Sequence, residues 1–351
     1  MHQVVTPYGR AGPSSRVRVH SWLDRVRSPV VASSYVSHRN SSPSYLARHP
    51  RAVLAAERRL RRMASQRPSH LLLHREASPL SRGGLERRLL DSAEFSVFDF
   101  DDALHEDWGE GGLYRKLAPK APKAYLAARR ASRVIAGNPT LAEWASGVND
   151  DVVLIPSCVA PEEYVMKTTY ALNDPPRLGW IGSPDNEVYL AFLAPALVEL
   201  NRTTGARLTL IGTEGRSLGD LERMIDRVPW SEETQHSSLA TLDVGLAPLP
   251  DDPYTRGKCG YRLLQLGAAG VPLVGSPVGV NRTILAQFGM PAPEEPAEWL
   301  DALVGLLTSS SGRRAELGGL ARSVVSSEFS YDAWLERWRE ASGFADGRRA
   351  T

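Results

Sequence analysis

The sequence predicts an α/β protein made of two doubly wound halves. Short apolar runs alternate with helical patterns along the chain, as they do in parallel sheets built from βαβ units. The length of 351 residues is enough for two domains of ordinary size. Prolines stand at both ends of the segment 156–176, between two series of strands, and indicate a linker there.

The expected strands fall into two series, one on each side of this linker. They lie at 3–6, 29–34, 70–74, 95–100, 133–137 and 151–156, then at 177–182, 206–212, 243–249 and 271–276. Helical patterns occupy 45–65, 84–91, 115–131, 187–203, 216–227, 258–269, 296–309, 312–327 and 331–341. We therefore expect Rossmann-like domains at 1–160 and 161–330, and a terminal helix and tail at 331–351. Trp334 and Trp338 share one face of that helix, which we expect to pack back onto the first domain.

Two open parallel sheets that face one another bind ligands at the carboxyl ends of their strands. A glycine turn at Gly182 and Ser183 follows the expected strand 177–182 and opens the next helix. Exposed backbone N–H groups at a helix start attract phosphate. The sequence has neither the glycine-rich loop of P-loop NTPases nor a dinucleotide-binding fingerprint after its first strand, which excludes these two classes.

The composition is that of an ordinary soluble protein, with 42% hydrophobic and 23% charged residues. No run of about 18 apolar residues is present to span a membrane. Two cysteines, Cys158 and Cys259, are too few for a disulfide framework or a zinc site. We therefore expect a reduced protein of the cytoplasm.

The net charge of +2 hides an asymmetry between the two halves of the chain. Residues 1–156 carry a net charge of +9, and residues 157–351 carry −7. Many arginines of the first half lie in helical patterns at 56–63, 85–90 and 127–133. One interpretation is a surface for nucleic acid or anionic lipid. The helical spacing favours the other interpretation, which is the solvated face of amphipathic helices.

The segment 255–281 carries the most specific signal in the chain. Lys258 and Arg262 lie four residues apart, and a helix that starts near Gly257 would place both on one face. Cations oppose the helix dipole at a helix start, so this placement makes sense where a polyanion binds. The plain alternative is that both side chains are solvated surface residues.

Together with the strand before it, this segment (243–281) resembles the donor-binding segment of the GT-B retaining glycosyltransferases of family 4. The resemblance extends to 7–26, to 131–159 and to the turn after 177–182, and it covers essentially the whole chain. It implies two Rossmann-like domains that face a cleft, a nucleotide-sugar donor, retention of configuration and no metal cofactor. The resemblance extends to one branch of this family, the enzymes that glycosylate 2-deoxystreptamine in the synthesis of aminoglycoside antibiotics.

In this family, two glutamates eight residues apart hold the donor sugar and the ribose. The matching positions here are Gly257 and Gln265, so the sugar-side glutamate is missing, whereas Gln265 can still bond ribose hydroxyls. The family's Arg and Lys after the first strand of the second domain are also missing, and Lys258 and Arg262 are the natural replacements. The residues expected to bind the donor are Gly12, Gly182, Ser183, Trp230, Lys258, Gly260, Tyr261, Arg262 and Gln265.

An acidic stretch at 95–112 is the second informative segment. Its carboxylates are those of Asp99, Asp101, Asp102, Glu106, Asp107 and Glu110. They suit a cationic acceptor such as an aminocyclitol. The Asp-x-Asp spacing also fits a magnesium or manganese site, and a solvated turn is the third interpretation. Where many relatives have a histidine that contacts the donor sugar, this chain has an aspartate, with His105 nearby.

The resemblance and the acidic stretch together predict a glycosyltransferase. It would move a sugar from a UDP-sugar, such as UDP-GlcNAc, to a hydroxyl of a small cationic aminoglycoside in antibiotic biosynthesis. The expected catalytic residues are Asp101, Asp102, Arg16 and Lys258. The expected acceptor-binding residues are Ser14, Ser15, Glu76, Asp99, Asp101 and His105.

Two alternatives remain at this point. One is a GT-B glycosyltransferase of cell-surface or lipid-linked glycan synthesis, and the other is a non-catalytic nucleotide-binding module. The expected partners are the nucleotide sugar and a small-molecule acceptor, without nucleic acid. A weak contact with a membrane surface, through the basic first half, is also expected.

Overall fold

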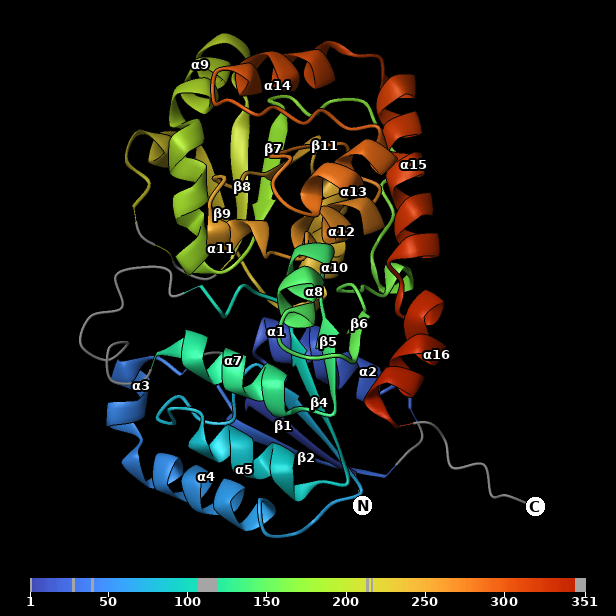
Figure 1. Ribbon diagram of the computed structural model, residues 1–351. Coiled ribbons are helices and arrows are strands. Elements are labelled where there is room, and N and C mark those ends of the chain that lie inside the picture. The colour runs from blue at the N-terminus through green and yellow to red at the C-terminus, as the bar shows by residue number, and fades with distance from the viewer. Residues whose placement is uncertain are drawn as a thin grey trace. The chain divides into compact units, whose positions relative to one another are not determined.

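The structure is a computed structural model that describes residues 2–26, 29–38, 41–106, 119–212, 215 and 217–344. These residues form two compact units (Figure 1). Unit 1 holds the chain up to Ser157, the short segment Arg256–Cys259 and the described residues from Trp334 onward. Unit 2 holds Cys158–Thr255 and Gly260–Ala333. The predicted acidic residues Asp107 and Glu110 lie outside the described residues.

Unit 1 is built on a six-stranded sheet in the order β2-β1-β3-β4-β5-β6. Its strands are β1 (His2–Tyr8), β2 (Val30–Val36), β3 (His70–His74), β4 (Phe95–Phe100), β5 (Arg133–Ala136) and β6 (Val152–Leu154). All neighbouring strands run parallel. Val4, Leu72, Phe98 and Ile135 are completely buried, which is why these strands read as apolar runs in the sequence.

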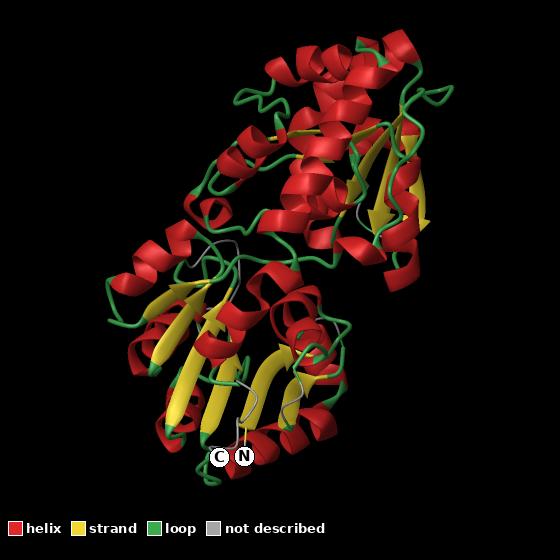
Figure 2. Ribbon diagram, turned by 90° about the vertical axis from the view of Figure 1, so that its right-hand side faces the viewer, coloured by secondary structure: helices red, strands yellow, loops and turns green. Residues whose placement is uncertain are grey.

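Helices flank this sheet on both sides (Figure 2). One layer contains α3 (Pro43–Arg48), α4 (Pro50–Met63), α5 (Gly84–Ser92) and α7 (Lys120–Arg130). Helix α5 packs between α4 and α7 and contacts β3 and β4. The single helix expected at 45–65 is two helices, because Pro50 begins a new one. The first residues of the helix expected at 115–131 lie outside the described residues.

The other helices of unit 1 come from three parts of the chain. A helical segment after β1 consists of α1 (Pro13–Ser15), the π-helical turn η1 (Arg16–His20) and α2 (Ser21–Leu23). Helix α8 (Pro139–Ser146) follows β5, and α16 (Tyr331–Ser342) comes from the end of the chain. Trp338 of α16 stacks on Trp22 of α2, with ring centres 5.4 Å apart. This contact attaches the end of the chain to the core of unit 1.

Unit 2 is built on a five-stranded parallel sheet in the order β11-β10-β7-β8-β9. Its strands are β7 (Arg177–Ile181), β8 (Arg207–Gly212), β9 (Ile225–Pro229), β10 (Val244–Ala247) and β11 (Leu273–Gly275). Strand β9 corrects the helix expected at 216–227, of which only η4 (Gly219–Met224) is helical. As an edge strand, β9 leaves both of its faces partly exposed, so the buried pattern of a central strand is missing from its sequence.

The helices of unit 2 pack in two groups. Helices α9 (Ala194–Thr204), α14 (Glu298–Thr308) and η4 contact one another, as do α12 (Tyr261–Ala268), α13 (Asn281–Phe288) and α15 (Ser311–Glu328). Shorter elements are η2 (Pro161–Glu163), η3 (Pro184–Leu193), α10 (Glu232–Ser238), η5 (Leu239–Thr241) and α11 (Pro253–Arg256). The helix expected at 187–203 begins as the 3-10 helix η3, and α8, α10 and α13 were not expected. Within the described ranges, no helix is both long and apolar enough to cross a bilayer.

Replacing Trp338 with alanine should lower the free energy of unfolding of unit 1 by about 3–5 kcal/mol, because a fully buried, stacked aromatic ring is lost. Urea unfolding followed by circular dichroism measures this change. Trp334→Ala on the same helix is the control, and its cost should be less than half as large because Trp334 is partly exposed. Equal losses for the two variants would contradict the assignment of Trp338 as the anchor.

Candidate functional site

Arg262 lies partly buried at the carboxyl end of β7 in unit 2. Its Nε donates a hydrogen bond of 2.7 Å to the carbonyl of Ile181, and its guanidinium lies 4.5 Å from the ring centre of Trp180. Burial lowers the pKa of Arg262 to about 10, so the side chain is still cationic at neutral pH. Among the residues that the structure describes, no carboxylate lies within 4.0 Å of this guanidinium. A partly desolvated cation at the carboxyl end of a parallel sheet is suited to bind an anion.

Gly182 makes room for this arrangement. A Cβ atom there would lie 2.4 Å from the ring of Trp180 and 2.9 Å from Nη2 of Arg262. The residue after it, Ser183, precedes η3 but makes no capping hydrogen bond with its side chain. Its Oγ instead accepts a hydrogen bond of 3.0 Å from the side chain of Asn186. Ser183 therefore does not cap η3 with its side chain, whereas Gly182 packs closely against Arg262.

Lys258 and Arg262 do not share the first turns of one helix, which corrects the sequence prediction. Helix α12 begins only at Tyr261, because Gly260 adopts a left-handed conformation with φ of 67°. A Cβ atom on Gly260 would also lie 2.7 Å from Ile284. Lys258 precedes this turn and belongs to unit 1, where its Nζ lies 3.8 Å from a carboxylate oxygen of Asp102.

Gln265 of α12 is buried in a network of hydrogen bonds in unit 2. Its Nε2 lies 3.3 Å from both the hydroxyl of Tyr164 and Oε1 of Gln235. The indole N–H of Trp230 donates to the same Gln235 oxygen at 3.2 Å. The structure thus joins Trp230 and Gln265, two of the residues expected to bind the donor. Gln235 and Tyr164 were not expected, although the capping box that begins at Ser231 signals the helix that carries Gln235.

The core of the site in unit 1 is a buried cluster of Arg18, Asp99 and His74. All three side chains have an exposed fraction of zero. Arg18 contacts both carboxylate oxygens of Asp99, at 2.5 and 3.2 Å, and Nδ1 of His74 lies 2.8 Å from one of them. Burial acts to raise the pKa of Asp99, but Arg18 and His74 outweigh it and lower that pKa. Asp99 was expected to bind the acceptor, and this is corrected because its carboxylate is enclosed and fully engaged.

His74 connects this cluster to the loop after β1. Its Nε2 lies 3.4 Å from Oγ of Ser14, which is partly exposed. Ser15 is buried instead, and its Oγ accepts a hydrogen bond of 3.3 Å from the backbone N–H of Tyr8. Gly12 packs directly on the same tyrosine, where a Cβ atom would lie 2.3 Å from that of Tyr8. Of the residues expected in this loop, Ser14 is therefore the one whose hydroxyl remains open to a ligand.

Arg16 follows this loop as the first residue of η1. Its side chain is 8% exposed, and Nη1 donates a hydrogen bond of 3.3 Å to the carbonyl of Arg10. The guanidinium therefore braces the loop from inside. Its expected catalytic role remains a prediction.

Arg75 holds the two aspartates that follow β4. Its guanidinium contacts Asp101 at 2.6 Å and Asp102 at 2.5 Å. Burial acts to raise the pKa of Asp101, yet Arg75 and its cationic neighbours lower it overall. Arg75 has a φ of 60°, in the left-handed region that residues other than glycine rarely adopt. This strained backbone turns the side chain toward the aspartates, and it marks the segment as a functional candidate.

The remaining candidate residues of unit 1 are also engaged. Glu76 is buried in an ion pair with Lys123, which also donates to the carbonyl of Ser78. His105 stacks on Trp144 of α8, with ring centres 4.4 Å apart. Asp99, Asp101 and Asp102 of the acidic stretch each have a cationic partner, as does Glu76. Glu106 differs, because its carboxylate lies 3.8 Å from His105, whose pKa is lowered by burial. These pairs reduce the electrostatic reason to expect a cationic acceptor, which remains a prediction.

Asn138 ties the segment Arg256–Cys259 to this edge of the sheet. Its Oδ1 accepts the N–H of Leu141 and caps α8, while its Nδ2 donates to the carbonyl of Gly257 at 2.8 Å. The thiol of Cys259 is buried 3.2 Å from the carbonyl of Asp101, and burial raises its pKa to about 12. Asn138 was not expected, and its sequence signal is that of an ordinary helix cap before a proline.

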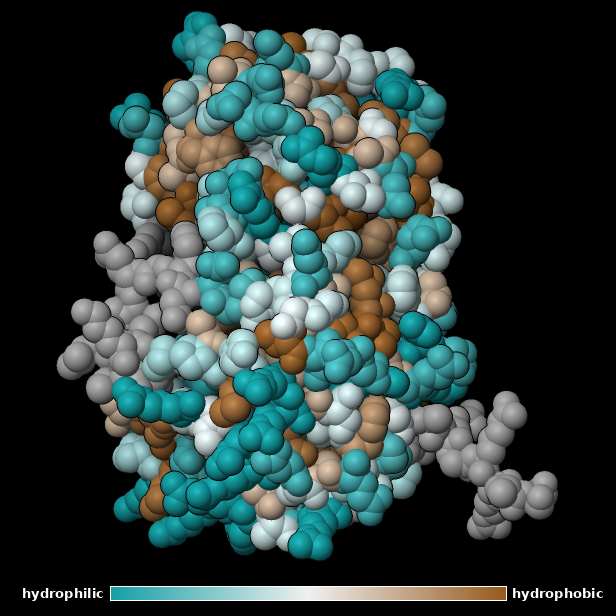
Figure 3. Space-filling view, viewed as in Figure 1, coloured by the Kyte–Doolittle hydropathy of each residue, from teal (hydrophilic) through white to brown (hydrophobic). Residues whose placement is uncertain are grey.

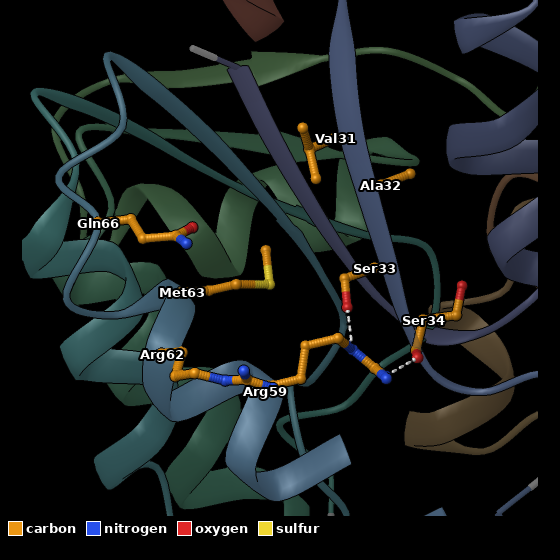
Figure 4. A pocket seen from close by; sticks show the side chains of 8 residues that line it. All are labelled: Val31, Ala32, Ser33, Ser34, Arg59, Arg62, Met63 and Gln66. Carbon is orange, nitrogen blue, oxygen red and sulfur yellow. Dashed lines mark hydrogen bonds between the residues drawn. The ribbon is translucent and has the colours of Figure 1, made fainter. Parts of the chain in front are cut away.

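A separate hollow of about 500 Å³ lies between β2 and α4 (Figure 4). Its polar wall is formed by Arg59, which donates to Oγ of Ser33 at 2.7 Å and to the carbonyl of Ser34 at 2.6 Å. These bonds brace the edge strand β2 against α4. None of the candidate site residues lines this hollow.

Potential metal ligands do not cluster in the part of the chain that the structure describes. No group of three or more His, Cys, Asp or Glu residues there could hold a metal ion. Asp99 and Asp101, which form the Asp-x-Asp pair, bind the guanidinium groups of Arg18 and Arg75 instead.

No protein-family model matches the sequence. No curated protein matches it either. Solved structures match its fold. Alr3699/HepE of Anabaena, in complex with UDP and glucose, aligns with a TM-score of 0.66 at 12% identity over 97% of this chain and 98% of that protein. WaaG, a glycosyltransferase involved in lipopolysaccharide biosynthesis, aligns with a TM-score of 0.63 at 13% identity over 98% and 100%.

A variant of S. aureus TarM, in complex with UDP among other ligands, aligns with a TM-score of 0.55 at 15% identity. This alignment covers 79% of the present chain but only 55% of TarM, so the chain spans about half the length of that protein. Together the matches establish that the chain has the GT-B fold of two Rossmann-like domains, as the sequence predicted.

Replacing Arg18 with methionine should destabilise unit 1 by about 3–5 kcal/mol at neutral pH, because it leaves the Asp99 carboxylate buried without its cation. The wild-type pair lowers the pKa of Asp99, so its contribution is present above the ordinary value of 3.8 and is lost as the pH falls below it. In the variant, the unpaired carboxylate should take up a proton at higher pH. The deficit should therefore shrink as the pH is lowered from neutral.

Urea unfolding at several pH values measures this deficit. The matched control is Arg10→Met, which breaks an exposed ion pair with Asp24 in the same unit and should cost less than about 1 kcal/mol. A deficit for Arg18→Met that does not change with pH would contradict the assignment to Asp99.

Proposed function

We propose that the chain is a glycosyltransferase of the family 4 type that uses a UDP-sugar. The observation that carries the proposal is Arg262, a partly buried cation at the carboxyl end of β7 without a carboxylate partner among the described residues. A diphosphate is the chemical group that such a cation fits, since a guanidinium binds phosphate oxygens with two parallel hydrogen bonds. The GT-B fold supports the proposal, because UDP is bound in several of the similar structures.

The rest of the donor would bind along α12. The N–H groups around Gly260 and Tyr261 precede the first turn of this helix, which favours an anion there. Gln265 and its partner Gln235 supply amide groups for the ribose, and the ring of Trp230 supplies an aromatic surface for the base. In transfer, Arg262 would stabilise the negative charge that develops on the departing diphosphate. Lys258 is proposed for the same task and would exchange its contact with Asp102 for phosphate.

The acceptor would bind to unit 1. Ser14 is the candidate for a hydrogen bond to the acceptor hydroxyl, with His74 and Asp99 as positioning residues behind it. Arg75 orients Asp101 and Asp102, which are candidates for contacts with sugar hydroxyls. We propose transfer with retention, in which the departing phosphate takes the proton of the acceptor hydroxyl. No metal ion is needed for this, since the guanidinium and ammonium groups neutralise the phosphates.

The paired carboxylates of unit 1 support a neutral, polyhydroxylated acceptor. A sugar or polyol of a cell-surface glycan has this chemistry and is our first candidate. The cationic aminocyclitol expected from the sequence is the second candidate. It could bind the carboxylates near the end of β4 only by displacing Arg75 or Lys258 from them. UDP-GlcNAc and UDP-glucose are the first donors to test.

Replacing Arg262 with methionine should weaken UDP binding by about 30-fold to 100-fold, because a charge-assisted contact to the diphosphate is lost. Isothermal titration with UDP measures this change, and Arg262→Lys should restore part of the affinity. Arg202→Met is the matched control, since Arg202 is an exposed arginine of unit 2 in a pair with Glu199. Unchanged affinity in Arg262→Met would overturn the donor site.

Lys258→Ala should weaken UDP binding less than Arg262→Met does, because Lys258 must first leave Asp102. Its effect should appear mainly in kcat if Lys258 acts on the leaving group in the transition state. A loss of UDP affinity as large as that of Arg262→Met, with kcat unchanged, would contradict this division of roles.

Turnover with neutral glycan and aminocyclitol acceptors separates the two candidate acceptor classes. Neutral acceptors should react faster, and Ser14→Ala should raise the KM for the acceptor while the affinity for UDP stays the same. Nuclear magnetic resonance of the product should show the anomeric configuration of the donor, and EDTA should leave the rate unchanged. Binding of UDP without transfer to any acceptor would favour a non-catalytic nucleotide-binding module.

A further inference from the structure

Helices α4, α5 and α7 of unit 1 carry an unusual concentration of exposed arginines. The eight residues are Arg51, Arg58, Arg61, Arg62, Arg87, Arg88, Arg129 and Arg130. We call the surface that they form the arginine face. Hydrophilic side chains gather over these three helices in Figure 3. On α4, the exposed positions 51, 54, 58 and 61 follow a helical spacing, so they form one continuous stripe.

The carboxylates of these three helices do not offset this charge. Glu86 is buried and accepts hydrogen bonds from Ser81 and from backbone N–H groups, and Glu57 accepts from the hydroxyls of Tyr35 and Ser78. Asp91 is the one carboxylate of α4, α5 and α7 that is exposed. Within the described ranges, none of the eight arginines lies within 4.0 Å of a carboxylate.

Several exposed arginines in unit 2 have carboxylate partners within 4.0 Å, although Arg177 and Arg223 have none among the described residues. Arg202 pairs with Glu199, Arg282 pairs with Glu294, and Arg313 pairs with Glu316. A surface on which eight guanidinium groups repel one another without local compensation is instead suited to a polyanionic partner. Arginine binds phosphate with particular geometric fit.

Apolar side chains stand between these charges. Leu54 on α4 is 50% exposed, and Tyr125 on α7 is 46% exposed. Leu54 lies one turn from both Arg51 and Arg58, and Tyr125 lies one turn from Arg129. Basic residues that alternate with exposed leucine and tyrosine on a helical surface are typical of binding at a membrane interface. A phosphate backbone in nucleic acid would leave such apolar groups without partners.

We infer that the arginine face binds the surface of a bilayer that contains anionic phospholipid. The arginines lie at the level of the headgroup phosphates, and Leu54 and Tyr125 enter the boundary with the acyl chains. Each basic residue near such a surface contributes roughly fivefold to the partition coefficient. The contact is therefore peripheral and is weakened by salt. It does not depend on the proposed glycosyltransferase activity.

Sedimentation of the full chain with lipid vesicles tests this inference. The chain should bind vesicles of phosphatidylcholine with phosphatidylglycerol and should not bind vesicles of phosphatidylcholine alone. The triple variant R58Q/R61Q/R88Q should lose on the order of a hundredfold in affinity. The triple variant R202Q/R282Q/R313Q removes the same charge from unit 2 and should bind much as wild type does. Thermal unfolding of both variants confirms that they are folded.

A second pair of substitutions separates the membrane from other polyanions. The variant L54S/Y125S keeps every charge and should still weaken vesicle binding, while a labelled duplex DNA or RNA should bind poorly to all variants. Absence of binding to anionic vesicles, or equal losses in the two arginine variants, would overturn the inference. Tight binding of nucleic acid that L54S/Y125S leaves unchanged would also overturn it and would assign the face to nucleic acid.

Discussion

A carboxylate that is buried at the end of a parallel strand needs a cationic partner beside it. The ion pair of Arg18 with Asp99 meets this need, and the site in unit 1 is organised around it. Arg18 comes from the helical segment directly after β1, and it also donates to the carbonyl of Ile155 at 2.8 Å, just beyond β6. His74 adds the end of β3 to the same cluster. One buried ion pair therefore fixes the ends of strands from across the sheet, and the loops that follow them start from fixed positions.

Other carboxylates of unit 1, at the ends of β3 and β4, are also neutralised by cations. Arg75 neutralises Asp101 and Asp102, and Lys123 neutralises Glu76. Pairs of this kind recognise a ligand through the direction of their hydrogen bonds more than through net charge, since their charges largely cancel. In unit 2 the balance is reversed, because Arg262 keeps a charge that no described carboxylate cancels. Under the proposed function, unit 1 would therefore bind hydroxyl groups and unit 2 would bind an anion.

The sequence was sufficient to predict two parallel sheets, because strands such as β3 and β4 are apolar runs with clear boundaries and helical patterns lie between them. The order of the strands within each sheet was not predicted. The sequence also did not predict β9, whose exposed edge position removes the usual pattern. The site was harder, since its contacts depend on which strand ends are neighbours. Arg75 and Asp101 lie 26 positions apart in the chain, and nothing in the sequence indicates their ion pair. His74 appears in the sequence only as the end of an apolar run. The spacing of Lys258 and Arg262 also gave no indication of the left-handed turn at Gly260, which separates Lys258 from α12.

The choice of arginine on the helices α4, α5 and α7 has a consequence for control. A guanidinium group stays protonated throughout the physiological pH range, and it is not a target of lysine acetylation. The charge of this surface is therefore constant, and neither a change of compartment pH nor an acetyltransferase can switch it off. What can change is the other side of the contact, through ionic strength or through the anionic content of the partner surface. The strength of the contact would therefore be set by the ionic strength and by the composition of the partner surface, and not by a change in the charge of this chain.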